Sequence, residues 1–91
     1  MPILRIPTPL RTYTSGQSEV PVPGKTVGEA LEALTAAHPA LRPHLYNGTG
    51  ELRPFVNLFV REENIREQQG LATPLADGDK VMIVPSIAGG K

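Results

Sequence analysis

One amphipathic helix between strand-like segments is the feature that most constrains the fold of this 91-residue chain. Thr26 and Glu29 match a capping box, in which a hydroxyl and a carboxylate satisfy free amides at the start of a helix. Apolar residues then recur at helical spacing, with Thr35 on the opposite side, until His38-Pro39 ends the helix. The apolar stripe comprises Val27, Ala30, Leu31, Leu34 and Ala37. Such a stripe predicts a helix that packs on a sheet.

Four segments have the character of strands. Residues 3–6 stop at two prolines and residues 18–22 alternate polar and apolar side chains, so these two are expected to form a hairpin. Residues 55–60 are β-branched and aromatic, which favours a strand in or near the middle of the sheet. Residues 80–84 are nearly all apolar, which predicts a buried last strand. The order predicts an α+β fold, a mixed sheet of four to five strands packed on one main helix.

Side chains of the 55–60 segment divide between two faces. Val56, Leu58 and Val60 share one face, while Phe55 and Phe59 lie on the other. Only one face can belong to the core, and we expect Phe59 to be a core residue rather than a partner contact.

Three arginines near this segment are expected to be ordinary solvated charges; they are Arg53, Arg61 and Arg66.

Composition excludes several classes of function. Nine basic and nine acidic residues cancel, and no Lys or Arg neighbours another, so nucleic acid is not an expected partner. The chain has no cysteine, which excludes disulfides and thiolate chemistry. No segment approaches the roughly 20 apolar residues of a membrane span. We therefore expect one small cytoplasmic domain.

No catalytic or metal-binding constellation is evident. His38 and His44 lie six residues apart without a third ligand, and none of the three serines has an accompanying base. Asp77 and Asp79 flank a glycine, which indicates a tight turn better than a cation site. We predict no intrinsic catalytic residue, no bound cofactor and no metal.

The C-terminal segment follows the last strand directly. It runs Pro85-Ser86-Ile87-Ala88-Gly89-Gly90-Lys91. Two glycines without side chains can enter a slot where any Cβ would clash. By itself the pair is more typical of a frayed terminus or of residues added for expression. If the last strand is central, however, the tail projects from a rigid base, which divides the chain into a domain of residues 1–85 and a flexible tail of residues 86–91.

Longer motifs show a family resemblance over most of the chain. They are the strand motif Phe55-Val56-Asn57, the segment Gly70-Leu71-Ala72-Thr73 and the ending Pro85-Ser86-Ile87-Ala88-Gly89-Gly90. Together they resemble the ubiquitin-like β-grasp sulfur carriers, the family that includes MoaD, ThiS and CysO, and most of all the CysO type. The resemblance implies the β-grasp fold and a carrier rather than an enzyme.

The resemblance also implies a chemistry at Gly90. An ATP-using enzyme of the ubiquitin-activating type would adenylate its carboxylate, and a sulfur donor would convert the adenylate to a thiocarboxylate. The partners would recognise the tail through Pro85, Ser86, Ile87, Ala88 and Gly89. In CysO-like systems the sulfur passes to an activated serine in a pyridoxal-phosphate cysteine synthase, and a JAMM-type metalloprotease releases cysteine. All cofactors would belong to the partners.

Lys91 departs from the family pattern, because it places the α-carboxylate one residue beyond Gly90. Two explanations stand equally: a native extension removed at the Gly90–Lys91 bond by the metalloprotease, or a residue added for expression.

Other functions stay open beside cysteine biosynthesis. They are a MoaD-like small subunit of molybdopterin synthase, a ThiS-like sulfur donor for thiamine or tRNA thiolation, a ubiquitin-like protein modifier and, from a different class, a non-reactive protein-binding module.

Overall fold

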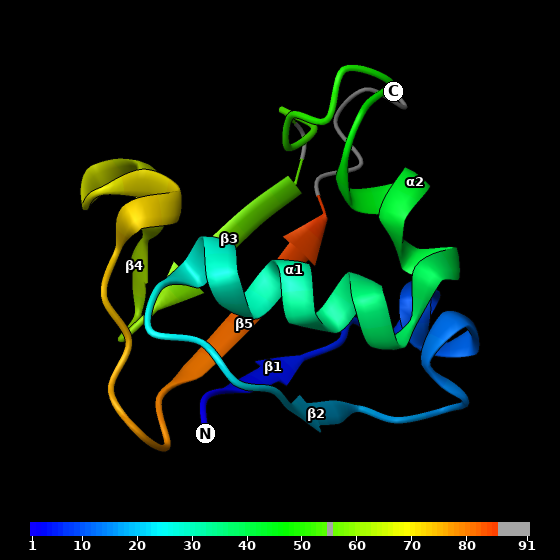
Figure 1. Cartoon of the computed structure of the whole chain (residues 1–91), viewed down its shortest axis with the longest axis horizontal. Helices are drawn as coiled ribbons and strands as arrows, with labels where there is room; N and C mark the ends of the chain where they lie inside the picture. Colours follow the sequence, from blue (N-terminus) through cyan, green and yellow to red (C-terminus); the bar gives the residue numbers. More distant parts are fainter. Residues whose placement is uncertain (55, 86–91) are drawn as a thin grey trace.

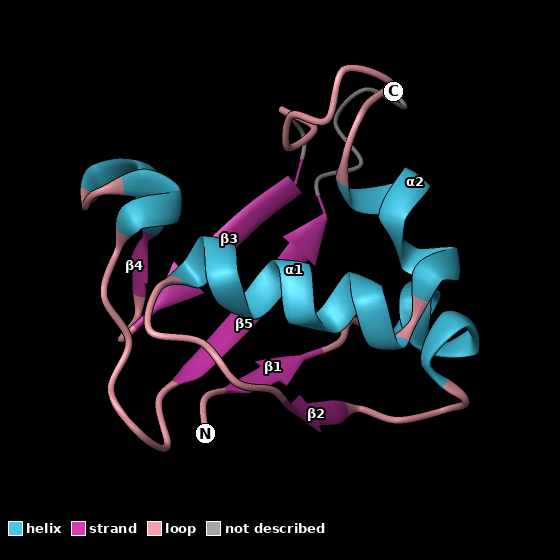
Figure 2. Cartoon of the chain, in the orientation of Figure 1, coloured by secondary structure: helices cyan, strands magenta, loops and turns pink. Residues whose placement is uncertain are grey.

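The chain folds as a five-stranded mixed sheet with α1 lying across one face, in a computed structural model that describes residues 1–54 and 56–85 (Figure 1). The strands are β1 (Ile3–Arg5), β2 (Glu19–Pro21), β3 (Val56–Val60), β4 (Glu63–Asn64) and β5 (Lys80–Pro85). The helices are α1 (Val27–Ala37) and α2 (Arg42–Leu45), with 3₁₀ turns η1 (Thr8–Thr14), η2 (Pro39–Leu41), η3 (Ile65–Glu67) and η4 (Gly70–Ala72). The predicted α+β, β-grasp architecture of one main helix on a mixed sheet is confirmed (Figure 2).

The strand order β2-β1-β5-β3-β4 places the last strand at the centre of the sheet. β5 runs parallel to β1 and antiparallel to β3, while β1 and β2 form the predicted antiparallel hairpin. β2 is an edge strand, which explains why Pro21 is tolerated there although it has no N–H to donate. The 55–60 strand lies next to the centre of the sheet, as predicted, and the condition that the last strand be central is met.

Local side-chain bonds start α1 where the sequence predicts. The Glu29 N–H donates to Thr26 Oγ1 at 3.2 Å. The Glu29 carboxylate in turn accepts from the Lys25 N–H at 2.8 Å, one residue before the N–H that a reciprocal capping box uses. The two bonds join Glu29, in the first turn of the helix, to the two residues that precede the helix.

The apolar stripe of α1 packs on the inner face of the sheet. Val27, Ala30, Leu31 and Leu34 are fully buried in one core with Leu58 and Val81. The stripe was expected to continue to Ala37, and this is wrong, because Ala37 is exposed while Thr35 is only 4% exposed.

The last turn of α1 is covered on its Thr35 side. The Thr35 hydroxyl donates to the Leu31 carbonyl at 3.1 Å and accepts from Arg42 Nη1 at 3.4 Å. The buried hydroxyl is thus satisfied within the helix and by the following segment, so its polarity does not oppose burial.

β5 is not buried on both faces, contrary to its apolar sequence. Val81 and Ile83 are buried against the helix layer, whereas Met82 is 43% and Val84 38% exposed on the opposite face. Phe59, which pairs with Met82, is half-buried on that face, so its expected place in the core is wrong. We call this the open face of the sheet, defined by Phe59, Met82 and Val84. No helix covers it within residues 1–54 and 56–85.

Candidate functional site

Pro85 is the last described residue and forms the root of the tail. Gly90 and the other tail residues, Ser86, Ile87, Ala88, Gly89 and Lys91, lie outside the described residues, as does Phe55. Pairing of β5 with β3 continues to Val56↔Pro85, so the root is held within the sheet on that side. Pairing with β1 stops at Arg5↔Met82, because the chain turns away at Pro7 into η1. The end of β5 is therefore clamped on one side and open on the other.

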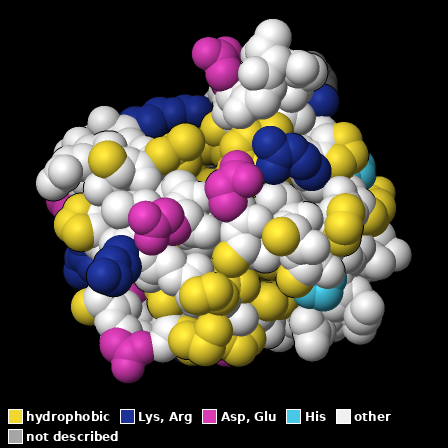
Figure 3. All heavy atoms as spheres, viewed as in Figure 1, with side chains coloured by type: hydrophobic (Ala, Val, Ile, Leu, Met, Phe, Trp, Pro, Cys, Tyr) yellow, Lys and Arg dark blue, Asp and Glu magenta, His cyan; other side chains and the backbone are white. Residues whose placement is uncertain are grey.

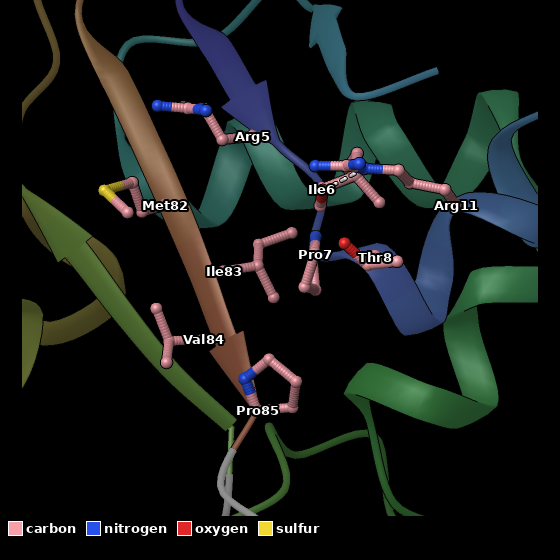
Figure 4. Close-up of a pocket in the computed structure, with 9 residues that line it drawn as sticks. All are labelled: Arg5, Ile6, Pro7, Thr8, Arg11, Met82, Ile83, Val84 and Pro85. Carbon is pink, nitrogen blue, oxygen red and sulfur yellow. Dashed lines mark hydrogen bonds between the residues drawn. The ribbon is translucent and has the colours of Figure 1, made fainter. Parts of the chain in front are cut away.

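A hollow of about 260 Å³ occupies the open side of β5, where β1 has ended (Figure 4). Its walls are the chain around Pro7 and the last residues of β5, with Arg5 and Arg11 among the lining side chains. Arg11 Nε donates to the Ile6 carbonyl at 3.0 Å, which fixes the guanidinium beside the hollow. Arg5 lies 3.5 Å from a carboxylate oxygen of Glu19.

A second hollow, of about 720 Å³, adjoins the first and shares Pro7 and Pro85 with it. Its lining is largely apolar and consists of Pro7, Pro9, Leu10, Pro43, His44, Arg53 and Pro85. The His44 ring stacks on Tyr13 with centroids 4.3 Å apart, and this contact joins η1 to α2. Both walls of the hollow are thus tied together.

Of the three arginines expected to be solvated charges, Arg61 and Arg66 are exposed and Arg53 is half-buried, and each also donates a hydrogen bond to a backbone carbonyl. Arg53 Nε donates to Pro43 at 2.8 Å, and Arg66 Nη2 donates to Pro54 at 2.7 Å. Arg61 Nη2 donates to the Pro74 carbonyl at 3.2 Å, and Nη1 of the same side chain pairs with the Asp79 carboxylate. Arginine suits this role because its planar fork presents several donors at once. Arg53 and Arg66 thereby fasten the segment that leads into β3.

The remaining candidate residues from the sequence, two aspartates and two histidines, have structural roles. Asp77 and Asp79 flank the turn at Gly78, whose φ is 84°, as predicted. His38 caps the end of α1 and His44 stacks on Tyr13. The described part of the chain contains no group of three or more potential metal-ligating His, Cys, Asp or Glu side chains.

Tyr46 is the clearest perturbed acid near the second hollow. It is 5% exposed, and the Arg42 guanidinium carbon lies 4.6 Å from its ring centroid. Burial raises the pKa of the Tyr46 hydroxyl, and the nearby Glu32 carboxylate raises it further. Tyr46 is therefore a neutral structural residue near neutral pH.

Two surface properties complete the picture. The helix side of the molecule carries hydrophobic, basic and acidic side chains interspersed, without a large patch of one charge (Figure 3). Within residues 1–54 and 56–85, no helix has the length and apolar composition that a membrane span requires.

The hollows at the root were not foreseen from the sequence. Pro7 and Pro9 indicated only the end of a strand, and Arg11 carried no motif of its own. The one sequence feature that could have indicated the second hollow is the high count of ten prolines. However, the four prolines that line this hollow come from three separate segments. Only the fold brings them together.

A helix on one face of a mixed sheet whose central strand leads directly to the C-terminal segment defines the β-grasp class. Residues 4–90 match the ThiS family, and the chain belongs to that family. It is 42% identical over 87 residues to the sulfur carrier protein CysO of Mycobacterium tuberculosis, covering 93% of this chain and 94% of the relative.

Two solved structures show the same likeness. In the BexX/CysO complex of Amycolatopsis orientalis, the matching chain has a TM-score of 0.88 and 34% identity, over 99% of this chain and all of that one. Small archaeal modifier protein 1 of Methanosarcina acetivorans has a TM-score of 0.87 and 30% identity, over 98% and 95% of the two chains. The chain is thus a sulfur carrier protein of the CysO type and not an enzyme, as predicted.

Proposed function

We propose that the chain carries sulfur as a thiocarboxylate on Gly90. The observation that supports this most directly is the position of β5, the central strand, whose end at Pro85 is held by β3. Gly90 follows five residues later, and an extended chain spans about 3.4 Å per residue. Its carboxylate can therefore enter an enzyme cleft about 17 Å deep while the domain stays outside. Two glycines at the tip suit a narrow entrance.

The proposed activation takes two steps on a partner enzyme of the ubiquitin-activating type. The Gly90 carboxylate oxygen attacks the α-phosphorus of ATP, pyrophosphate leaves, and an acyl adenylate forms. A sulfur donor then delivers sulfide to the acyl carbon, and AMP departs with the electron pair of the broken carbon–oxygen bond. Activation is needed because a carboxylate has only oxide to lose, whereas AMP is a good leaving group. ATP and the sulfur donor are bound by the partners, and the carrier supplies the reacting carboxylate.

Lys91 must be removed before this chemistry, because the carbonyl carbon of Gly90 is joined to the Lys91 nitrogen in a peptide bond and Gly90 has no free carboxylate. We propose that a JAMM-type metalloprotease hydrolyses the Gly90–Lys91 bond, with water supplying the hydroxyl of the new carboxyl group. The processed carrier would end in Ser86-Ile87-Ala88-Gly89-Gly90, and these residues with Pro85 would be what the enzymes recognise.

Cysteine biosynthesis is the proposed destination of the sulfur, supported by the likeness to proteins named CysO. The thiocarboxylate would attack an activated serine on a pyridoxal-phosphate cysteine synthase, and the metalloprotease would release cysteine from the carrier. Because ATP and reduced sulfur donors are present in the cytoplasm, we propose that the carrier acts there. The BexX/CysO complex shows that a related carrier binds a partner protein.

Protein modification is the second candidate, favoured by the likeness to small archaeal modifier protein 1. In that case the activated Gly90 would form isopeptide bonds to lysines, visible as a ladder on reducing gels. A MoaD-like role would instead give a stable complex with a molybdopterin-synthase large subunit, and a ThiS-like role would supply thiamine or tRNA thiolation. A non-reactive binding module would tolerate Gly90→Ala and show no ATP-dependent change.

Intact-mass spectrometry of the carrier from its native host tests the proposal. We expect loss of Lys91 and replacement of one oxygen by sulfur. A purified form ending at Gly90, incubated with the activating enzyme, ATP and a sulfide source, should show the same replacement, and the form that retains Lys91 should not. An unchanged full-length mass in cells that make cysteine by this route would contradict the proposal.

A further inference from the structure

The two hollows beside the tail root form one continuous feature, which we call the root groove. They meet at Pro7 and Pro85, so the groove begins where the tail begins. Three arginines line it, namely Arg5, Arg11 and Arg53, and none of its lining residues is Asp or Glu. Glu19 lies 3.5 Å from Arg5 and equally close to Lys80, so its single charge only partly balances Arg5. Together with Arg11, this leaves the groove positively charged at the tail root, among the residues that the structure describes.

Arg11 is the cation best prepared for an outside partner. Its Nε is engaged by the Ile6 carbonyl, yet within residues 1–54 and 56–85 its Nη atoms make no hydrogen bond and no carboxylate lies within ion-pair distance. Arg42 and Arg61, by contrast, each have a carboxylate partner. A half-buried guanidinium fixed at Nε presents its remaining donors in a set orientation, which suits bidentate binding of a carboxylate.

The apolar part of the groove is rigid. Four of its lining residues are prolines, whose φ angles are fixed by their rings, and Leu10 forms a floor that is 8% exposed. The Tyr13–His44 stack holds η1 against α2 and keeps the walls in place. A preformed apolar surface loses little conformational entropy when a partner binds, so it favours docking of an apolar side chain.

We propose that the root groove is the docking site for the enzyme that activates Gly90, and that it receives a surface segment of that enzyme bearing an apolar side chain next to a carboxylate. The apolar side chain fills the proline-lined hollow and the carboxylate pairs with Arg11. This inference rests on the proposed function, since it assigns a contact to the proposed activating enzyme. Charge complementarity selects the occupant, because within residues 1–54 and 56–85 the groove is lined by cations and apolar surface and by no carboxylate.

The test measures activation kinetics with the purified activating enzyme, ATP and the carrier form ending at Gly90, by ATP–pyrophosphate exchange. Arg11→Glu reverses the charge, and Pro9→Glu places a carboxylate in the apolar hollow. Each variant is expected to raise the KM for the carrier about tenfold with little change in kcat, because docking weakens but the tail chemistry does not change. Lys25→Glu is the matched control, since this exposed lysine precedes α1, outside the groove, and its KM should stay within about twofold of wild type.

Thermal unfolding verifies that each variant is folded. If Arg11→Glu fails to fold for lack of its bond to Ile6, the Pro9→Glu result decides alone. Wild-type KM should also rise with added salt, whereas in Arg11→Glu it should fall, because salt then screens a repulsion between two carboxylates. A rise of equal size in both proteins would overturn the role of Arg11.

Each other outcome has a definite meaning. A wild-type carrier that is never adenylated overturns the proposed function, and this inference with it. Normal wild-type activation with unchanged KM in both groove variants overturns the groove inference alone. A lower KM in the groove variants also overturns it, because that result would assign the groove to the chain's own tail as an inhibitory contact.

Discussion

The two faces of the sheet are formed by the same strands, but one face is buried beneath α1 and the other is exposed. On the covered face, Leu58, Val81 and Ile83 are at most 3% exposed beneath α1. On the open face, Met82 and Val84 come from the same strand β5 and are 43% and 38% exposed. Side chains alternate along a strand, so every second residue of β5 anchors the strand in the core while its neighbours form exposed surface on the open face.

A substitution in the tail should separate function from stability most completely. Gly90→Val is expected to abolish adenylation, because a β-branched side chain at the reacting residue cannot pass a slot that fits only glycine. The free energy of unfolding should not change, since the residue lies beyond the strand that the core anchors. ATP–pyrophosphate exchange and urea unfolding measure the two effects. Full activity in this variant would remove the steric explanation for the Gly-Gly pair.

The covered and open faces should differ sharply in response to truncation. Leu58→Ala is expected to lower the free energy of unfolding by about 2–5 kcal/mol, because it removes buried methyl groups and leaves a cavity. Met82→Ala, its matched control on the open face, should cost less than about 1 kcal/mol. Urea denaturation of both variants measures the difference. Equal losses would mean that the open face is buried in solution, as it would be in a tight dimer.

Much of the covered layer could be predicted from the sequence because the signals were local. The Thr26 cap and the glycine turn before β5 each act within a few residues and are found where expected, and the apolar stripe of α1 is buried as expected except at Ala37. Whether β5 is central was left open by the sequence, because strand order depends on contacts between distant segments.

The outer surfaces could not be predicted, because they depend on contacts between distant segments. Four consecutive apolar residues in β5 indicate a strand but do not reveal that no layer covers Met82 and Val84. Thr35 was expected on the exposed side of α1. It is buried because Arg42 and the turn that follows α1 cover it, and helical spacing does not reveal that contact. The root groove combines η1, α2 and the end of β5, and no sequence spacing connects them.

Attachment of the covering helix can be tested at Gly24. Its φ is +152°, and a Cβ there would lie 2.7 Å from the Ala30 backbone nitrogen in the first turns of α1. Gly24→Ala is expected to cost about 1–3 kcal/mol, since both the backbone angle and the contact oppose it. Gly50→Ala is the matched control, with a φ of +85° but open space around the added carbon, and it should cost about 1 kcal/mol from the backbone alone. Equal costs would show that the approach to α1 relaxes freely.

The smallest expected effect is at Tyr46, at the margin of the covered layer. Burial raises the pKa of its hydroxyl in the folded chain, so above the ordinary tyrosine value of about 10 the unfolded chain loses this proton first. The contribution of Tyr46 to stability is therefore complete below pH 10 and declines as the pH rises toward the folded pKa. Tyr46→Phe should reduce the loss of unfolding free energy between about pH 9 and pH 11, measured by urea denaturation. An equally steep loss in the variant would show that Tyr46 does not contribute to it and is no more buried in solution than a surface tyrosine.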